Sequence, residues 1–278
     1  MPKCRLLPLL AILPVLAACG TPAPAERKAN VETLATGTMT PAYLQTRQFD
    51  LYSLSRTSGP QDLLVVYIEG DGLAWRRIDE ASPDPTPVTP TALRLALADS
   101  APAVAYLARP CQFTDEARRR NCRTALWTSH RYGEDVVAAT GEALDMLKRR
   151  AGAQRLGLVG FSGGGAIAAL VAAQRDDVVW LKTVAAPLDT SAFTGHHGVT
   201  PLVSSLNPAD MGTALGDVPQ HHYAGADDKI VPPSIAQSYM ARLPSRRCAV
   251  LHVVAGAGHH EGWEKNWPVF NTDTPACR

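Results

Sequence analysis

A serine, two adjacent aspartates and two adjacent histidines follow one another along this chain, and these are the side chains that acyl-transfer chemistry uses. Ser162 is the centre of Gly-Phe-Ser-Gly-Gly at 160–164, and the two pairs stand at 227–228 and 259–260. A serine hydroxyl is a poor nucleophile unless a histidine accepts its proton. That histidine needs a carboxylate to fix its tautomer and stabilise its charged form. The sequence therefore holds one candidate nucleophile and two candidates for each partner.

The surroundings of Ser162 are typical of a sharp turn from a strand into a helix. Residues 156–159 predict a short buried strand, and residues 166–173 are small, apolar and helix-forming. In such a nucleophile elbow the serine is held in a strained conformation, while Gly160 and Gly164 leave room for the two backbones. A phosphate loop or a dinucleotide fingerprint would need other residues around the glycines. A glycine-rich turn with a solvated serine is the remaining alternative.

Strands alternate with helices along most of the chain. Besides the elements that flank Ser162, we expect strands at 45–54, 63–68, 103–107, 178–185, 221–224 and 248–254. We expect helices at 92–98, from Thr128 or Ser129 to about 150, and at 234–243. This alternation predicts a mainly parallel, doubly wound sheet with helices on both faces. Each candidate residue follows a predicted strand, so all of them should meet at one edge of the sheet.

The order serine, aspartate, histidine resembles that of the α/β-hydrolases, and the resemblance covers most of residues 45–265. The acid of that family often stands in Asp-x-x-Val-Pro, which Asp228-Lys-Ile-Val-Pro232 matches and Asp227 does not. Its histidine commonly follows Gly-x-Gly, which selects His259 over His260. The resemblance implies the α/β-hydrolase fold and a serine hydrolase that cleaves an ester or related acyl bond without a cofactor or metal.

The resemblance also implies an oxyanion hole made of two backbone N–H groups. One belongs to Gly163, directly after the nucleophile, and we assign the other to Asp71, with Gly72 as the alternative. The family commonly has a histidine just before this second donor, whereas this chain has Glu69. A carboxylate at that place would oppose a developing oxyanion unless it points away.

The first residues resemble a lipoprotein signal. A positive start precedes an apolar run of about 13 residues, which is too short to span a membrane. The run ends in Leu-Ala-Ala-Cys-Gly at 16–20, similar to a bacterial lipobox, so we expect a signal peptide at 1–18 and a lipid on Cys19. This predicts anchoring in the cell envelope, in the outer membrane facing the periplasm. An ordinary secretory signal is the alternative. Residues 19–40 predict a flexible tether before a hydrolase domain at 41–278.

Four cysteines remain after the anchor, and an even number in an oxidising compartment suggests two disulfides. Three pairings are possible, of which we favour the nearest in sequence, Cys111 with Cys122 and Cys248 with Cys277. Zinc is disfavoured because no Cys-x-x-Cys is present. The adjacent histidines at 221–222 would point to opposite faces of a strand, which also argues against a metal.

The length and charge of the chain limit the number of domains and the classes of partner. A chain of 278 residues suits one large domain, and its formal net charge of +1 does not favour nucleic-acid binding. Residues 187–219 are rich in Gly, Pro, Ser and Asn and predict an irregular excursion that shapes the substrate pocket. We expect an acyl substrate, and a membrane as partner through the lipid anchor. A thioesterase, lipase or peptidase is possible on the same machinery, as is a non-catalytic envelope lipoprotein.

Overall fold

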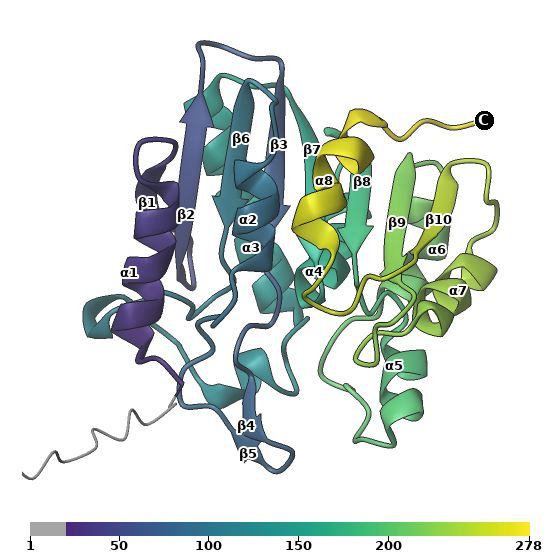
Figure 1. Ribbon diagram of the computed structural model, residues 1–278, viewed down its shortest axis with the longest axis horizontal. Helices are drawn as coiled ribbons and strands as arrows, with labels where there is room; N and C mark the ends of the chain where they lie inside the picture. Colours follow the sequence, from purple (N-terminus) through teal and green to yellow (C-terminus); the bar gives the residue numbers. More distant parts are fainter. Residues whose placement is uncertain (1–20) are drawn as a thin grey trace, which may run out of the picture.

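The computed structural model describes residues 21–278, which are organised around one eight-stranded sheet (Figure 1). The strand order is β1-β2-β6-β3-β7-β8-β9-β10, and a separate hairpin pairs β4 with β5. β2 runs antiparallel to both β1 and β6, and every other neighbouring pair is parallel, so the sheet is mainly parallel. The strands are β1 (Thr40–Gln45), β2 (Asp50–Thr57), β3 (Leu63–Ile68), β4 (Trp75–Arg77), β5 (Glu80–Ala81), β6 (Ala103–Leu107), β7 (Arg155–Phe161), β8 (Val178–Val184), β9 (Gln220–Gly225) and β10 (Ala249–Val254).

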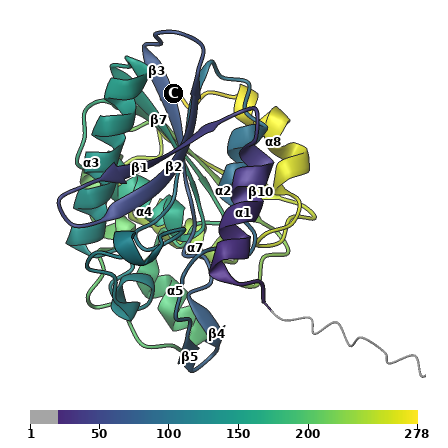
Figure 2. The same cartoon turned by 90° about the vertical axis from the view of Figure 1, so that its left-hand side faces the viewer.

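Helices cover both faces of the sheet, which Figure 2 shows from the side of the sheet. One face carries α1 (Pro24–Ala35), α2 (Thr91–Leu97) and α8 (Trp263–Thr272), and the other carries α3 (Glu134–Ala151), α4 (Gly163–Ala172) and α7 (Pro233–Arg242). The central strand β3 shows why both faces need cover. Its Leu64 and Val66 pack into one buried cluster, while Val65 and Tyr67 pack into the other. Successive side chains of a strand alternate between faces, so an unbroken apolar run fills two cores.

The sequence located most of these elements, and the differences have local causes. The strands predicted at 63–68 and 103–107 are confirmed. The single strand predicted at 45–54 is instead the pair β1 and β2, joined by a turn in which the hydroxyl of Thr46 donates to the carbonyl of Phe49. The helix predicted from Thr128 or Ser129 begins only at Glu134, because residues 128–132 form turns and the extended backbone of Gly133 caps the start of the helix.

The flexible tether predicted at 19–40 is wrong for residues 24–35, which form α1. This helix packs through Val31 and Ala35, both almost fully buried, and its Arg27 reaches the carboxylate of Asp84 at 3.5 Å. The signal at 1–18 and the lipidation site Cys19 lie outside the described residues. Among the helices within residues 21–278, none has the length and apolar character needed to cross a bilayer.

The excursion at 187–219 is less irregular than the sequence predicted. It contains α5 (Thr190–His197), a 3₁₀ turn (Pro208–Met211) and α6 (Gly212–Leu215). A side chain caps the start of α5, because the carboxylate of Asp189 accepts hydrogen bonds from the amides of Ser191 and Ala192. Short polar side chains at such positions satisfy the free N–H groups of a first helical turn. Figure 1 shows α5 and the β4–β5 hairpin beyond the same ends of the sheet strands.

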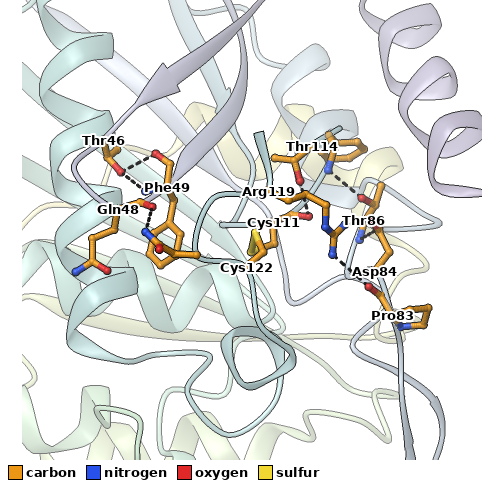
Figure 3. The surroundings of a disulfide bond; sticks show 12 residues. Thr46, Gln48, Phe49, Pro83, Asp84, Thr86, Cys111, Thr114, Arg119 and Cys122 are labelled. Carbon is orange, nitrogen blue, oxygen red and sulfur yellow. Dashed lines mark hydrogen bonds and ion pairs between the residues drawn. A yellow bond between two sulfur atoms is a disulfide. The ribbon is translucent and has the colours of Figure 1, made fainter. Parts of the chain in front are cut away.

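Both predicted disulfides are present, and each fastens a loop or tail. Cys248–Cys277 holds the end of the chain beside the start of β10. Cys111–Cys122 closes a loop that lies between the β1–β2 turn and the loop before α2 (Figure 3). In that loop the guanidinium of Arg119 pairs with the carboxylate of Asp84 at 2.7 Å. The loop therefore joins two segments that are far apart in the sequence.

Candidate active site

Three loops at the carboxyl ends of β7, β9 and β10 bring Ser162, Asp228 and His259 into one hydrogen-bonded chain. Nε2 of His259 lies 3.1 Å from Oγ of Ser162, and its Nδ1 lies 2.9 Å from Oδ2 of Asp228. With the proton on Nδ1, the imidazole donates to the carboxylate and accepts from the serine hydroxyl. The side chains of Asp228 and His259 are 0% and 9% exposed. The imidazole is therefore held between its partners and away from bulk water.

The turn that carries Ser162 has the strain expected of an elbow. Its φ and ψ are 49° and −126°, in a region that a residue with a side chain rarely occupies. A Cβ at Gly160 would lie 2.4 Å from the carbonyl oxygen of Gly164, and one at Gly164 would lie 2.3 Å from the carbonyl oxygen of Ile68. Both glycines are thus required where backbone meets backbone. Gly160 lets β7 and α4 come close together at the serine, and Gly164 lets the start of α4 pack against the end of β3.

The structure also separates the members of each candidate pair. The second carboxylate oxygen of Asp228, Oδ1, accepts from the amides of Ile230 and Val231, each at 2.8 Å, which fixes the carboxylate facing His259. Asp227 is exposed. His260 turns to the other side and lies 3.1 Å from the hydroxyl of Thr91. Of the four candidates in the two pairs, Asp228 and His259 are the ones brought to Ser162.

The two backbone N–H groups expected to bind an oxyanion stand beside the serine. Within residues 21–278, neither the Gly163 amide nor the Asp71 amide has a hydrogen-bond acceptor. A Cβ at Gly70 would lie 3.2 Å from Cβ of Ser162, so the backbone just before Asp71 lies against the serine. Gly72 instead lies against the loop before α2, with a Cβ position 2.0 Å from the carbonyl oxygen of Pro85. This arrangement favours Asp71 over Gly72 as the second donor.

The peptide unit that carries the Asp71 amide is held from its other end. The buried side chain of Gln112 donates to the carbonyl oxygen of Gly70 at 2.9 Å, and its own oxygen accepts from the amide of Arg109 at 3.1 Å. The Gly70 carbonyl and the Asp71 N–H belong to one planar unit, so fixing the first orients the second. Gln112 follows Cys111, and the disulfide loop thus supports the candidate oxyanion hole.

The carboxylate of Asp71 forms a network that the sequence did not predict. It pairs with Arg109 at 3.1 Å and Arg131 at 2.9 Å, and it accepts from the hydroxyl of Tyr132 at 3.2 Å. Burial alone would lower the pKa of Arg131, but the facing carboxylate outweighs it and the pKa is raised. A Cβ at Gly163 would lie 2.0 Å from Oδ1 of Asp71, so this carboxylate occupies the space beside the amide of Gly163.

Comparison with known proteins gives the fold. No family model matches the sequence, and a search of curated proteins finds no match. Solved structures do match. Est1E from Butyrivibrio proteoclasticus has a TM-score of 0.59 at 11% identity, over 84% of this chain and 97% of its own. The naproxen esterase (carboxylesterase NP) from Bacillus subtilis has a TM-score of 0.59 at 12% identity, over 90% and 96%. Proline iminopeptidase from Mycobacterium smegmatis has a TM-score of 0.59 at 14% identity, over 84% and 97%.

This chain has the α/β-hydrolase fold. The expectation drawn from the order of serine, aspartate and histidine is confirmed at the level of the fold, because identities of 11–14% carry no more than that. Within this fold the candidate residues occupy loops at the carboxyl ends of parallel strands, where ligands of open α/β sheets bind.

Glu69, the residue that departs from the α/β-hydrolase pattern, points away from the candidate oxyanion hole. Its Oε1 accepts from the amide of Gly70 at 2.9 Å, and its Oε2 accepts from the hydroxyl of Tyr106 at 3.2 Å. Burial raises the pKa of Glu69 to about 7. The carboxyl group therefore lies inside the fold next to α2, and near neutral pH much of it is protonated.

A cavity of about 1090 Å³ opens onto Ser162 and His259. The β4–β5 hairpin, the loop before α2 and α5 form its walls. Apolar side chains stand exposed around it, among them Trp75, Val199, Ile230 and, at the tip of the hairpin, Ile78 with 94% of its surface exposed. Isolated apolar residues on a surface are ordinary, but several around one cavity indicate a binding site for an apolar group.

Proposed function

We propose that this protein is a serine hydrolase that cleaves an ester or a related acyl bond through an acyl-enzyme. The observation that supports the proposal is the chain of hydrogen bonds from Ser162 through His259 to Asp228 at the base of an apolar cavity. A hydrogen-bonded serine and histidine, with the histidine oriented by a buried carboxylate, is the arrangement that activates a serine hydroxyl.

The reaction then follows from the positions of these groups. Oγ of Ser162 attacks the acyl carbon while Nε2 of His259 accepts its proton, and Asp228 stabilises the imidazolium that forms. The amides of Gly163 and Asp71 donate to the oxyanion. His259 next returns the proton to the leaving group, which departs and leaves the acyl group on Ser162. A water molecule, deprotonated by His259, releases the acid and regenerates the serine.

The walls of the cavity favour an apolar acyl group. Trp75, Ile78 and Val199 offer apolar surface along the walls of the cavity onto which Ser162 opens. A thioesterase, a lipase or a peptidase would use the same serine and histidine, and one of the similar structures is itself named a peptidase. The acyl chain length and the leaving group are therefore what the first assays must separate.

Activity profiling tests this proposal. Purified protein should hydrolyse p-nitrophenyl esters, with a preference for one range of acyl lengths, and Ser162→Ala should reduce kcat to the background rate while the fold is retained. A thioester and an anilide of the preferred acyl group distinguish the related activities. Equal hydrolysis by wild type and Ser162→Ala would contradict the proposal. Absence of any activity on all three substrate classes would favour a non-catalytic envelope lipoprotein.

We also propose that the protein is exported and held in the outer membrane, facing the periplasm, by a lipid on Cys19. The apolar run before Cys19 and the lipobox-like residues support this proposal. Two disulfides agree with an oxidising compartment. Cys19→Ser should move the protein from the membrane fraction to the soluble fraction and abolish incorporation of labelled fatty acid. A mutant that stays bound, with a wild type that takes up no label, would contradict the anchor.

A further inference from the structure

His221, His252 and Asp273 gather on the face of the sheet that α8 covers, and none of them lines the cavity at Ser162. Their ligand atoms all lie within 4.8 Å of one another, which no other group of three such side chains in residues 21–278 matches. The adjacent histidine at 222 points to the opposite face, as expected for neighbours on a strand. The three possible metal ligands therefore come from different elements and are well separated in the sequence.

The sheet register explains how the three side chains meet. In the parallel pair β9 and β10, His221 is opposite Val250, and His252 is two residues further along the same face. The two imidazole rings lie 5.1 Å apart between centroids. Asp273 is the residue that caps the end of α8 and extends its carboxylate over the pair. Two strands and a helix end therefore supply one ligand each.

Each of the two histidines has one ring nitrogen that makes no hydrogen bond to the protein, although the carboxylate of Asp273 comes within 3.5 Å of Nδ1 of His221. Among the described residues, Nδ1 of His221 and Nε2 of His252 are buried without a hydrogen-bond partner. The contrast with His222 is informative, because both of its nitrogens lie within 2.9 Å of polar partners, the hydroxyl of Thr183 and the side chain of Gln220. Burial of a polar atom without a hydrogen-bond partner is destabilising, so two such atoms in one cluster call for a physical explanation.

We propose that His221, His252 and Asp273 bind a divalent ion of the zinc class, which fastens the end of α8 to the edge of the sheet. Two imidazoles and a carboxylate, completed by water, form a donor set that zinc accepts. A tetrahedral zinc site separates its ligand atoms by about 3.3 Å. Nδ1 of His221 already lies 3.5 Å from Oδ2 of Asp273.

Little movement is needed to complete the site. Since no two of the three ligand atoms are more than 4.8 Å apart, the largest adjustment is about 1.5 Å if the tetrahedral spacing is to be reached. The side chain of Asp273 is 64% exposed and is free to make that adjustment, whereas His221 is held in the fold. The exposed carboxylate also gives the ion a path from solvent.

Two positively charged side chains, Lys182 and Arg278, lie close enough to His221 to interact with it electrostatically. The ammonium of Lys182 faces the end of α8, where it donates to the carbonyls of Phe270 and Asn271 and to the side chain of Asn271. Its three N–H groups are thus directed at helix acceptors. The two positive charges weaken the attraction of a divalent ion, so the affinity should be below that of a site with four protein ligands.

An ion at this position would act on the fold near the candidate base. α8 begins beside the loop of His259, whose carbonyl accepts from the indole N–H of Trp263 at 3.0 Å. The other end of α8 carries the ligand Asp273, and the chain beyond it is held by the Cys248–Cys277 disulfide. The ion and the disulfide would together fix the C-terminal segment to β9 and β10.

Calorimetric titration of the chelator-treated full chain with Zn²⁺ tests the proposal. Wild type should bind one Zn²⁺ and respond weakly to Ca²⁺, which prefers oxygen ligands. Asp273→Asn should weaken binding at least about tenfold, and His252→Ala should abolish it. Asp176→Asn removes an exposed carboxylate elsewhere and should bind as wild type does. A His196→Ala, His197→Ala double variant should also bind Zn²⁺ as wild type does, because the two histidines that it lacks lie on α5, away from the proposed site.

Thermal melting provides a second measurement that does not depend on the His252 variant folding. At one fixed Zn²⁺ concentration, the melting temperature of wild type and of Asp176→Asn should rise by the same amount, and that of Asp273→Asn should rise by clearly less. If wild type neither binds Zn²⁺ nor gains stability, the cluster is only a histidine–aspartate ion pair and the proposal fails. It also fails if Asp273→Asn binds as tightly as wild type, because the ion then sits elsewhere.

Discussion

Burial of Glu69 should make the stability of this protein depend on pH in a way that one substitution removes. The group is 1% exposed, and its pKa is raised from 4.5 to about 7 because burial disfavours the charged form. The folded state therefore holds a proton that the unfolded chain has lost. The stabilisation is fully present below about pH 4.5 and is lost as the pH rises through about 7.

The size of the effect follows from the two pKa values. With pKa values of 7 folded and 4.5 unfolded, Glu69 contributes about 2.5 kcal/mol less to stability at pH 8 than at pH 5. Glu69→Gln removes the titration and keeps an oxygen to accept from the amide of Gly70. Relative to wild type, the variant should therefore gain about 2.5 kcal/mol between pH 5 and pH 8.

Urea unfolding of both proteins at the two pH values measures this difference, since the other titrating groups are common to both. Glu134→Gln, at an exposed position on α3, controls for the loss of a surface charge. A difference between Glu69→Gln and wild type that stays constant within about 0.5 kcal/mol over this range would refute the reasoning. It would mean that the carboxyl group is paired or hydrated in a way that the observed contacts do not explain.

Two further predictions concern the candidate site. Asp228→Asn should lower kcat by on the order of 10⁴-fold while Asp227→Asn stays near wild type, because only Asp228 contacts His259; steady-state kinetics showing the reverse ranking would move the acid to Asp227. Gly163→Ala should lose most activity with the fold retained, since its Cβ would lie 2.0 Å from Oδ1 of Asp71 and must displace that carboxylate; an alanine variant with wild-type kcat/KM would show that Asp71 does not need its present position.

Local patterns were enough to select the residues of the candidate site that stand in short motifs. Ser162 stands in a motif whose glycines are needed for backbone packing, and the structure places them against backbone atoms. Asp228 and His259 were selected by the residues around them, and they are the ones that contact each other. The central strands were predicted as readily, because a short unbroken apolar run such as Leu63–Ile68 is typical of a strand that is buried on both faces.

Parts that depend on several distant segments were not predictable in this way. The partners of Asp71 come from two separate loops, and nothing near Arg109 or Arg131 in the sequence indicates that they meet one carboxylate. α1 has few apolar residues. α8 contains Pro268, which argues against a helix, although Trp263 and Trp267 are spaced for one buried face. Whether α1 and α8 form, and which side chains meet at Asp71, is determined by the packing of the whole fold.

The central claim is that Ser162 is a nucleophile activated by His259, and intact-protein mass spectrometry after treatment with a fluorophosphonate tests it most directly. Wild type should gain one adduct, and peptide mapping should place it on Ser162. His259→Ala should react far more slowly, and Ser162→Ala should not react while remaining folded. An adduct on another residue, or a His259→Ala variant labelled at the rate of wild type, would contradict the account.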